Sequence, residues 1–350
     1  MKIAQVPGDQ IPLSEKLLSS PYSIPLVSYL LSEELVKRGH DVFIFAPIDS
    51  KTKAKVMPEW LSSKDPRFKL KGEKRFKIFE QYCEYVKREA KNFDIIHVHD
   101  IYLRAFDLLK GLETPVIGTF HNPKFYKKDK KRYKKVMFVG ISKSQIKNNP
   151  GFNFVGQVYN GIWVEKFPFN KEPKDYLLWM GRISPEKGPL EAEKIASKLG
   201  KKLIMIGPPQ PQHPKYVKKV KDFAKKHKNI KLLGPIYDFK KKTEYLKNAL
   251  CLLMPLKWEE PFGIVMIEAM ACGTPVVAYK RGAAKELIKD KETGFLVDGF
   301  WEAIKAIKKI DQIQREKCRK WVQENFTAEK MAEGYEKIYQ KVIEKWKKKN

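Results

Sequence analysis

The chain has 350 residues, and at about 150 residues per domain this length predicts two domains, each large enough to bury a core. Apolar residues make up 43% and aromatic residues 12%, an ordinary globular mixture that excludes a disordered, collagen-like or coiled-coil chain. The first nine residues lack the apolar core of a signal peptide, and no stretch of about 18 uncharged apolar residues occurs. We therefore expect a protein that neither spans a membrane nor is exported.

The chain is strongly basic. Seventy Lys and Arg residues stand against 41 Asp and Glu residues, which leaves a net charge of +29. Such an excess indicates a polyanionic partner, and nucleic acid, anionic lipid and phosphorylated small molecules all qualify. Lysine enrichment of the kind seen in heat-adapted proteins would explain much of the charge without a partner. Charge alone does not choose among these explanations.

Four cysteines are scattered along the chain without a CxxC pair. They are Cys83, Cys251, Cys272 and Cys318. This pattern predicts neither a disulfide framework nor a zinc cluster, and it is typical of a protein from the reducing cytoplasm.

The first half of the chain alternates strands and helices. Residues 2–6 predict a buried strand, and apolar residues recur at helical spacing over residues 27–35, before Gly39, which is suited to end a helix. Further buried strands are expected at residues 42–46, 95–98, 116–119 and 136–141. This order predicts a doubly wound parallel sheet.

The second half predicts another α/β sheet. Gly, Asn and Pro gather over residues 149–169 and mark a linker. Strands are then expected at residues 176–180, 203–206, 230–233, 251–254 and 275–278. We predict an N-terminal domain over residues 1–158, a C-terminal domain over residues 159–326, and a helix over residues 327–350 that packs back toward the N-terminal domain. Ligands of such sheets bind outside the carboxyl ends of the strands, so two sheets in tandem predict a site at an interdomain cleft.

Residues 258–277 carry the strongest chemical signal. Pro261 and Gly263 predict a tight loop, and residues 264–272 predict a helix whose positive N-terminus opens onto that loop as an anion site. Glu260 lies just before this helix and Glu268 lies inside it. The two carboxylates can therefore face one cleft at different depths and accept hydrogen bonds from sugar hydroxyls. The weaker alternative is a pair of glutamates on a solvated helix face.

This segment resembles the retaining glycosyltransferases of the GT-B fold that carry the E-x7-E motif, the glycosyltransferase family 4-like or group 1 type. The resemblance rests on both glutamates, the Glu-Pro-Phe-Gly loop, the run Glu-Ala-Met-Ala-Cys-Gly-Thr-Pro-Val-Val from Glu268, and residues 294–297. It implies two Rossmann-like, doubly wound parallel-sheet domains that face an interdomain cleft. The N-terminal domain would bind the acceptor and the C-terminal domain the nucleotide-sugar donor.

A second block, residues 179–188, resembles the diphosphate-binding loop of that family. Gly181 follows an expected strand, and Arg182 and Lys187 would clamp the phosphates, Arg as a planar fork and Lys as a point charge. Taken alone, two cations in a basic protein indicate only a charged surface. Their place between a strand and a helix favours the phosphate-binding interpretation.

The N-terminal domain offers His121 at the end of an expected strand. Its position resembles the family's placement of a residue that contacts the donor sugar, and a purely structural role is the alternative. His97 and His99 alternate along one strand and are expected to be structural. In the first loop the family commonly has a Gly-Gly pair, and Tyr22 and Ser23 stand there instead. This departure leaves the acceptor side open.

The resemblance implies the following site residues: for catalysis Glu260, Arg182, Lys187 and His121; for donor binding Glu268, Gly181, Pro261, Phe262, Gly263, Ile264, Asn160 and Gly161; and for the acceptor loop Tyr22 and Ser23. Glu268 would hold the nucleotide ribose and Glu260 the donor sugar. No metal and no cofactor is expected beyond the nucleotide sugar, because the two cations and the helix start at Gly263 can oppose the charge of the departing diphosphate.

The predicted function is transfer, with retention, of a sugar from a UDP-, GDP- or ADP-sugar to an acceptor hydroxyl on a glycan, a lipid-linked molecule or a small molecule. A nucleotide-sugar epimerase of the same architecture is the first alternative. A basic nucleic-acid-binding protein is the second, although no recognisable nucleic-acid-binding module occurs and we expect no nucleic-acid partner.

The stretch from Lys124 to Lys135 suggests a membrane contact. It interleaves eight cations with three aromatic residues, a composition that suits the surface of an anionic bilayer. The hypothesis is a cytoplasmic enzyme held peripherally on the inner membrane face. A solvated cationic loop is the alternative.

Overall fold

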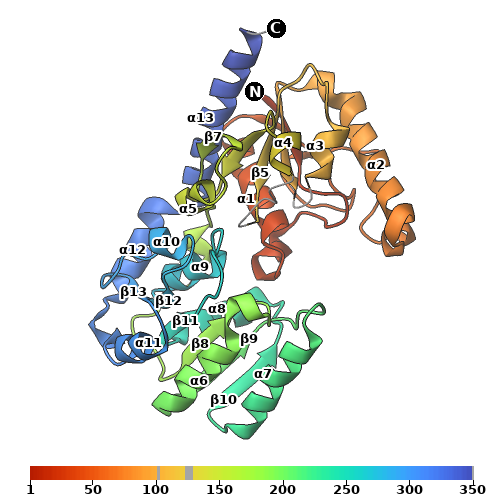
Figure 1. Ribbon diagram of the computed structural model, residues 1–350. Helices are drawn as coiled ribbons and strands as arrows, with labels where there is room; N and C mark the ends of the chain where they lie inside the picture. The colour runs from red at the N-terminus through yellow and green to blue at the C-terminus, as the bar shows by residue number, and fades with distance from the viewer. Residues whose placement is uncertain (101–102, 123–128, 349–350) are drawn as a thin grey trace. The chain divides into compact units, whose positions relative to one another are not determined.

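The computed structural model describes residues 1–100, 103–122 and 129–348, and it divides into two compact units (Figure 1). The first unit comprises Met1–Leu17, Tyr22–Gly161 and Ala328–Asn350, and the second comprises Leu18–Pro21 and Ile162–Thr327. Each unit is built on one parallel sheet with helices on its faces, so the predicted pair of Rossmann-like domains is confirmed.

Among the described residues, the first sheet has seven strands. Their spatial order is β3 (Lys55–Val56), β2 (Asp41–Ile44), β1 (Lys2–Val6), β4 (Ile95–Asp100), β5 (Val116–Phe120), β6 (Met137–Gly140) and β7 (Asn153–Gln157). The strand order reverses direction between β1 and β4. Helices α1 (Ser23–Lys37) and α13 (Ala328–Lys347) pack together against one face. Helices α2 (Gly72–Glu89) and α3 (Arg104–Leu108) pack together on the other.

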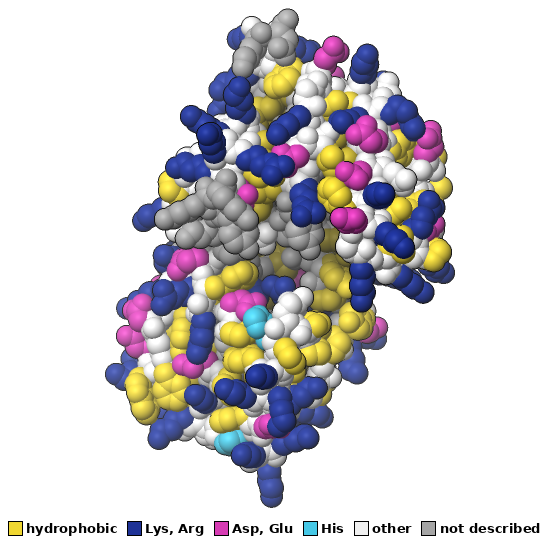
Figure 2. All heavy atoms as spheres, turned by 45° about the vertical axis from the view of Figure 1, so that its right-hand side comes forward, with side chains coloured by type: hydrophobic (Ala, Val, Ile, Leu, Met, Phe, Trp, Pro, Cys, Tyr) yellow, Lys and Arg dark blue, Asp and Glu magenta, His cyan; other side chains and the backbone are white. Residues whose placement is uncertain are grey.

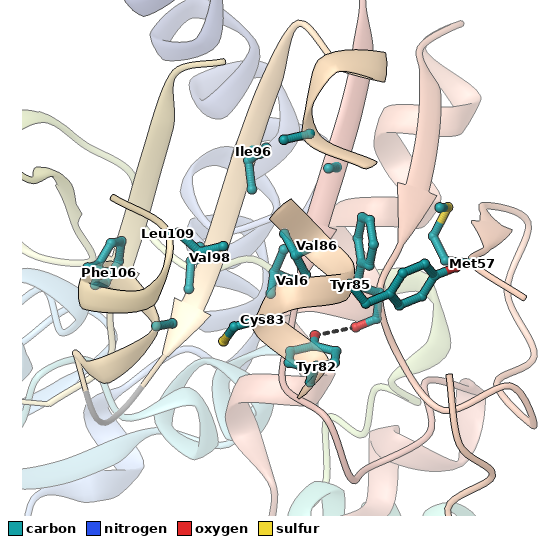
Figure 3. Packing of buried hydrophobic residues seen from close by; sticks show 14 of the residues in the cluster. Val6, Met57, Tyr82, Cys83, Tyr85, Val86, Ile96, Val98, Phe106 and Leu109 are labelled. Carbon is teal, nitrogen blue, oxygen red and sulfur yellow. Dashed lines mark hydrogen bonds between the residues drawn. The ribbon is translucent and has the colours of Figure 1, made fainter. Parts of the chain in front are cut away.

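The aromatic core under α2 explains how the weakly patterned residues 48–93 fold. Figure 3 shows α2 against the sheet, with Val6, Ile96 and Val98 facing it from the strands. Tyr82 is buried and its hydroxyl donates a 2.5 Å hydrogen bond to the carbonyl oxygen of Phe45. This bond links α2 to the end of β2, and the ring of Tyr82 remains in the apolar layer.

Strand β7 lies inside the segment that we predicted as a linker. The Gly, Asn and Pro residues around it concealed a strand that pairs with β6. Gly156 allows α13 to approach this strand, because a Cβ there would lie only 2.5 Å from the Cδ1 atom of Ile338. The short strand β3 and the strand β13 described below were not predicted either.

Among the described residues, the second sheet has six strands. Their order is β10 (Ile230–Gly234), β9 (Leu203–Ile206), β8 (Leu177–Met180), β11 (Cys251–Met254), β12 (Val276–Tyr279) and β13 (Gly294–Val297). Here the order reverses direction between β8 and β11. One face carries α6 (Pro189–Leu199), α7 (Pro214–Lys226) and α11 (Phe300–Ile307), and the other carries α8 (Phe239–Asn248), α9 (Ile264–Ala271) and α12 (Arg315–Asn325).

The C-terminal helix α13 is part of the first unit. Its apolar stripe, including Met331 and Val342, is buried. Glu336 of this helix receives hydrogen bonds from Arg38 at 2.5 Å and faces the Nε2 atom of His40 at 3.0 Å. The last turns of the chain therefore complete the fold of the first domain.

Two further features of the sequence are the cysteines and the polarity of the helices. All four cysteines are buried thiols, and none of them forms a disulfide with another described residue. Within the described ranges, every helix is too short or too polar to cross a bilayer.

Glu193 of α6 is a buried acid without a compensating partner. Its side chain is fully buried, and among the described residues neither carboxylate oxygen has a hydrogen-bond partner. Burial raises the pKa of Glu193 to about 8, because the charged form loses its hydration. The carboxyl group is therefore protonated in the folded protein at neutral pH.

Replacing Glu193 with glutamine should change how stability depends on pH. The pKa of Glu193 in the folded protein lies above the unfolded value of about 4.3. The contribution of this carboxyl group to the free energy of unfolding is therefore fully present below about pH 4.3 and is lost as the pH rises to about 8. Over this pH range we expect the urea midpoint of the wild-type protein to fall relative to that of Glu193→Gln. Outside this range, the difference between the two midpoints should stay constant. The exposed control Glu324→Gln should follow wild type throughout, and parallel curves for Glu193→Gln would contradict the assignment.

Candidate active site

Two loops of the second unit meet where the strand order reverses. β8 and β11 are parallel neighbours, so the loops that follow them leave the same edge of the sheet. In open α/β sheets this switch point is where ligands bind. The first loop, residues 181–188, leads into α6, and the second, residues 255–263, leads into α9.

Lys187 and Glu260 join these loops through a buried ion pair. Lys187 Nζ lies 2.5 Å from Glu260 Oε2, and the side chains are 14% and 5% exposed. The indole Nε1 of Trp258 donates to the same oxygen at 2.8 Å, and Lys187 Nζ lies 4.9 Å from the centre of that ring. Glu260 Oε1 has no hydrogen bond among the described residues. One carboxylate oxygen is thus fixed, and the other is left for a ligand.

The backbone around Glu260 is braced by the loop after β12. Ala283 N donates to the carbonyl oxygen of Glu260 at 2.8 Å, and Gly282 N donates to a carboxylate oxygen of Glu259 at 2.7 Å. A Cβ at Gly282 would lie 2.2 Å from the Glu260 carbonyl oxygen, so only glycine permits this approach. The position of Glu260 is therefore set by its neighbours.

The loop after β8 is held in a similar way. Gly181 N donates to the carbonyl oxygen of Ile206 at 3.0 Å, and a Cβ at Gly207 would lie 1.7 Å from the Gly181 carbonyl oxygen. Arg182 follows Gly181 and its side chain is 45% exposed, and its one ion pair within the described ranges is a 4.0 Å contact with Glu186. Its guanidinium is available to an anion, whereas Lys187 is already paired.

Helix α9 begins beside Glu260. Gly263 takes the N-cap position with φ +90° and has no side chain to cap the first turn, so the N–H groups from Ile264 onward form the positive end. Pro261 and Phe262 are buried, and the Phe262 ring packs edge-on against Phe326. These contacts fix where the helix starts.

Glu268 is paired with a different lysine from the one that pairs with Glu260. It is 2% exposed and its Oε1 accepts a 2.7 Å hydrogen bond from Lys242 of α8. Lys242 is itself buried and also donates to the carbonyl oxygen of Leu18 at 3.0 Å. Burial raises the pKa of Glu268, and the nearby ammonium opposes that rise. The two glutamates thus have separate lysine partners.

Lys242 was missed by our sequence analysis. It lies within a run of lysines, and nothing in composition distinguishes it from its neighbours. A signal exists in the helical spacing, since Phe239 and Leu246 stand three positions before and four positions after it. That spacing puts Lys242 on the buried face of α8, where a lysine needs an acidic partner.

His121 of the first unit follows β5 directly. Its Nε2 lies 3.4 Å from Nδ1 of His99, and the two rings stack at 25°. Burial lowers the pKa of His121 to about 3, so the imidazole is neutral. His121 is half-buried, whereas His97 and His99 are fully enclosed, in the structural environment that their alternation predicted.

The other predicted residues of the first unit lie at two places. Tyr22 is the N-cap residue of α1 and is 55% exposed, and Ser23 is the first residue of that helix. Asn160 is buried, and within the described ranges its Oδ1 has no hydrogen-bond partner. Gly161 N contacts the sulfur of Met331 at 3.3 Å. Gly161 therefore lies against α13.

The basic stretch from Lys124 to Lys135 is described only in part, since residues 123–128 lie outside the described residues. Its next four residues form α4 (Asp129–Arg132), and Arg132 pairs with Asp107 at 2.7 Å. On the face drawn in Figure 2, Lys and Arg side chains are spread over both units. Across the described residues, no three His, Cys, Asp or Glu side chains are arranged to hold a metal ion.

The two parallel-sheet units define the class of this protein, the glycosyltransferases of the GT-B fold. Residues 162–328 match the family described as glycosyl transferases group 1, and residues 26–142 match glycosyltransferase family 4. Together these matches cover most of both units. The chain belongs to the group 1 glycosyltransferases.

Relatives and solved structures agree with this assignment. An uncharacterized glycosyltransferase of Methanocaldococcus jannaschii is 28% identical over 284 residues, covering 73% of this chain and 77% of the relative. Sucrose-phosphate synthase from Thermosynechococcus elongatus superposes with a TM-score of 0.76 at 19% identity, covering 98% of this chain and 99% of that one. Anabaena HepE in complex with UDP and glucose gives a TM-score of 0.70 at 15% identity, covering 97% and 100%. The GT-B fold is thereby confirmed.

Breaking the Lys187–Glu260 pair should destabilise the protein more than breaking a surface pair. Lys187→Met leaves a buried carboxylate without its cation, and we expect a loss of roughly 3–5 kcal/mol in the free energy of unfolding. Urea denaturation of Lys187→Met, Glu260→Gln and the double variant gives the coupling, expected at roughly 1–3 kcal/mol. The control Lys257→Met, which loses a 3.3 Å pair that is half exposed, should cost less than about 1 kcal/mol. Equal losses in Lys187→Met and Lys257→Met would refute the buried pair.

Proposed function

We propose that this glycosyltransferase moves a sugar from a nucleoside-diphosphate sugar to an acceptor hydroxyl with retention at the anomeric carbon. The observation that carries the proposal is the Lys187–Glu260 pair at the switch point of the second sheet, beside the start of α9. It combines a cation, a carboxylate and a helix N-terminus at one strand edge. A sugar diphosphate offers groups that match all three.

The diphosphate is assigned to Arg182, Lys187 and the first turn of α9. Charge builds on this group as the glycosidic bond breaks, and fixed positive groups stabilise that charge without reorganising. Arg182 is largely free to close on a phosphate, while Lys187 is held in place by Glu260. The nucleotide sugar then serves as co-substrate, and we propose that no metal ion or other cofactor is needed.

Glu260 is assigned to the donor sugar and Glu268 to the ribose. Glu260 Oε2 is occupied by Lys187 and Trp258, so its Oε1 is the atom that would accept a sugar hydroxyl. Glu268 has Lys242 on Oε1, which compensates a buried negative charge. In the first unit, His121 is assigned to the donor sugar, and Tyr22 and Ser23 to the acceptor side.

The donor is proposed to be a UDP-sugar, with GDP- and ADP-sugars as the alternatives. Three of the matching structures are of Anabaena HepE with UDP, with UDP and glucose, or with UDP-glucose. Retention is proposed from the E-x7-E motif. Among the sequence relatives is a lipopolysaccharide 1,2-N-acetylglucosaminetransferase of Salmonella typhimurium, 31% identical over 135 residues. We propose a glycan or lipid-linked acceptor, reached by a cytoplasmic enzyme whose residues 124–135 contact an anionic membrane.

Arg182→Ala should nearly abolish transfer while leaving the fold intact, because among the described residues this exposed side chain has one ion pair, a 4.0 Å contact with Glu186. Loss of one charge partner of the transition state costs about 100- to 1000-fold in kcat. The donor is first identified by thermal shift with UDP, GDP and ADP and their sugars, since a ligand at about 100 times its Kd adds about 2.7 kcal/mol. Lys218→Ala, which removes an exposed cation of α7 in the same unit, is the control and should retain wild-type turnover.

Wild-type turnover in Arg182→Ala would remove the diphosphate assignment. Product formed without any acceptor would favour an epimerase instead. Failure of all nucleotide sugars to shift the melting temperature would remove the proposed donor class.

A further inference from the structure

One face of the first sheet carries a row of polar side chains that the proposed reaction leaves unexplained. Gln5 of β1 pairs in register with His97 of β4, and His99 pairs with Thr119 of β5. All four are buried, although the interior of a sheet is normally apolar. Such a row is stable only when every polar group finds a partner.

Helix α13 supplies the missing partners for one end of this row. The hydroxyl of Tyr335 lies 2.7 Å from Thr119 Oγ1, which lies 2.8 Å from His97 Nε2. The hydroxyl of Tyr339 lies 2.7 Å from His97 Nδ1. Both ring nitrogens of His97 are therefore engaged.

Gln5 determines the direction of the hydrogen bonds at the other end. Its Nε2 donates to the Tyr339 hydroxyl at 3.1 Å, and its Oε1 faces His99 Nε2 at 2.9 Å. An amide oxygen can only accept, so His99 Nε2 carries the proton. Burial holds the pKa of His99 well below its usual value, and the ring is neutral. Its Nδ1 is then a bare acceptor.

The bare nitrogen of His99 faces His121. His121 Nε2 lies 3.4 Å from His99 Nδ1, so it must be the donor of this pair. The neutral His121 ring has one proton, which leaves its Nδ1 unprotonated. Within the part of the chain that the structure describes, this Nδ1 has no hydrogen-bond partner.

We infer that Gln5, acting through His99, holds His121 in the Nε2–H tautomer, so that His121 presents Nδ1 as an acceptor for a sugar hydroxyl. Gln5 and His99 are positioning residues, and the inference rests on the proposed contact between His121 and the donor sugar. It narrows the substrate class. The sugar must offer a hydrogen-bond donor, such as a hydroxyl, at the contacted position, because a carboxylate or a hydrogen there cannot donate to Nδ1.

The tautomer is read directly by long-range proton–nitrogen NMR of the full chain labelled with 15N-histidine. Signals of His121 are assigned by their loss in His121→Asn. We expect Nδ1 of His121 to have the shift of an unprotonated imidazole nitrogen and Nε2 that of a protonated one, with the same pattern for His99. A proton on Nδ1 of His121 in the wild-type protein overturns the inference, whatever the variants do.

Two variants test whether Gln5 is the determinant. Gln5→Met keeps the length of the side chain but can neither donate nor accept, and it should give His121 signals of mixed tautomers. The control Tyr335→Phe removes a hydroxyl from the same network without touching the Gln5–His99 bond, and it should leave the His121 tautomer unchanged. An unaltered tautomer in Gln5→Met, or a mixture in Tyr335→Phe, contradicts the role of Gln5.

Kinetics separate this inference from the proposed function. With the donor found by thermal shift, Gln5→Met should lower kcat/KM by roughly two- to tenfold, the equivalent of one neutral hydrogen bond. A donor that lacks the contacted hydroxyl should be equally poor with both proteins. If no nucleotide sugar binds, the proposed function fails while the NMR result stands. If the donor reacts but His121 carries its proton on Nδ1, only the tautomer assignment fails.

Discussion

A polar or charged group is buried at low cost only where a partner meets it, and this constraint shapes both units. In the second unit, Glu260 and Glu268 are each buried against a lysine from another element. Without those cations, each carboxylate would cost several kcal/mol to desolvate. The lysines thus allow two acids to stay inside the protein. They also fix which oxygen of Glu260 remains open to a ligand.

The same requirement explains why the end of the chain returns to the first unit. The hydroxyl of Tyr339 on α13 meets His97 Nδ1, which has no other partner among the described residues, and the hydroxyl of Tyr335 adds a second partner to Thr119 Oγ1. Phenylalanine in place of Tyr339 would fill the same space but would leave His97 Nδ1 unsatisfied, at about 1–3 kcal/mol. Helix α13 therefore contributes specific hydrogen bonds in addition to apolar area.

The fold was largely predictable because buried parallel strands are short apolar runs, as at residues 203–206 and 251–254, where the expected and observed bounds coincide. Strand β7 was not, because its sequence contains Gly156 and turn residues flank it. Motif residues such as Glu260 and Lys187 could be recognised from the sequence because each lies within a short local motif. The ion pair between them could not be predicted, because it joins two loops whose residues are 73 positions apart. Lys242 was missed for the same reason, because its partner Glu268 lies on another helix.

The polar row of the first sheet shows how one amide can set the chemistry of a distant ring. Imidazole, hydroxyl and amide groups can each donate and accept, so the chain from Tyr339 through Gln5 and His99 to His121 has two self-consistent directions. They differ in which atom of the Gln5 side-chain amide, Oε1 or Nε2, points toward His99. If the Gln5 amide were rotated by 180°, the protons of His99 and His121 would each lie on Nδ1 instead of Nε2. Nδ1 of His121 would then be a donor instead of an acceptor. The observed orientation, with the amide nitrogen on Tyr339, selects the acceptor.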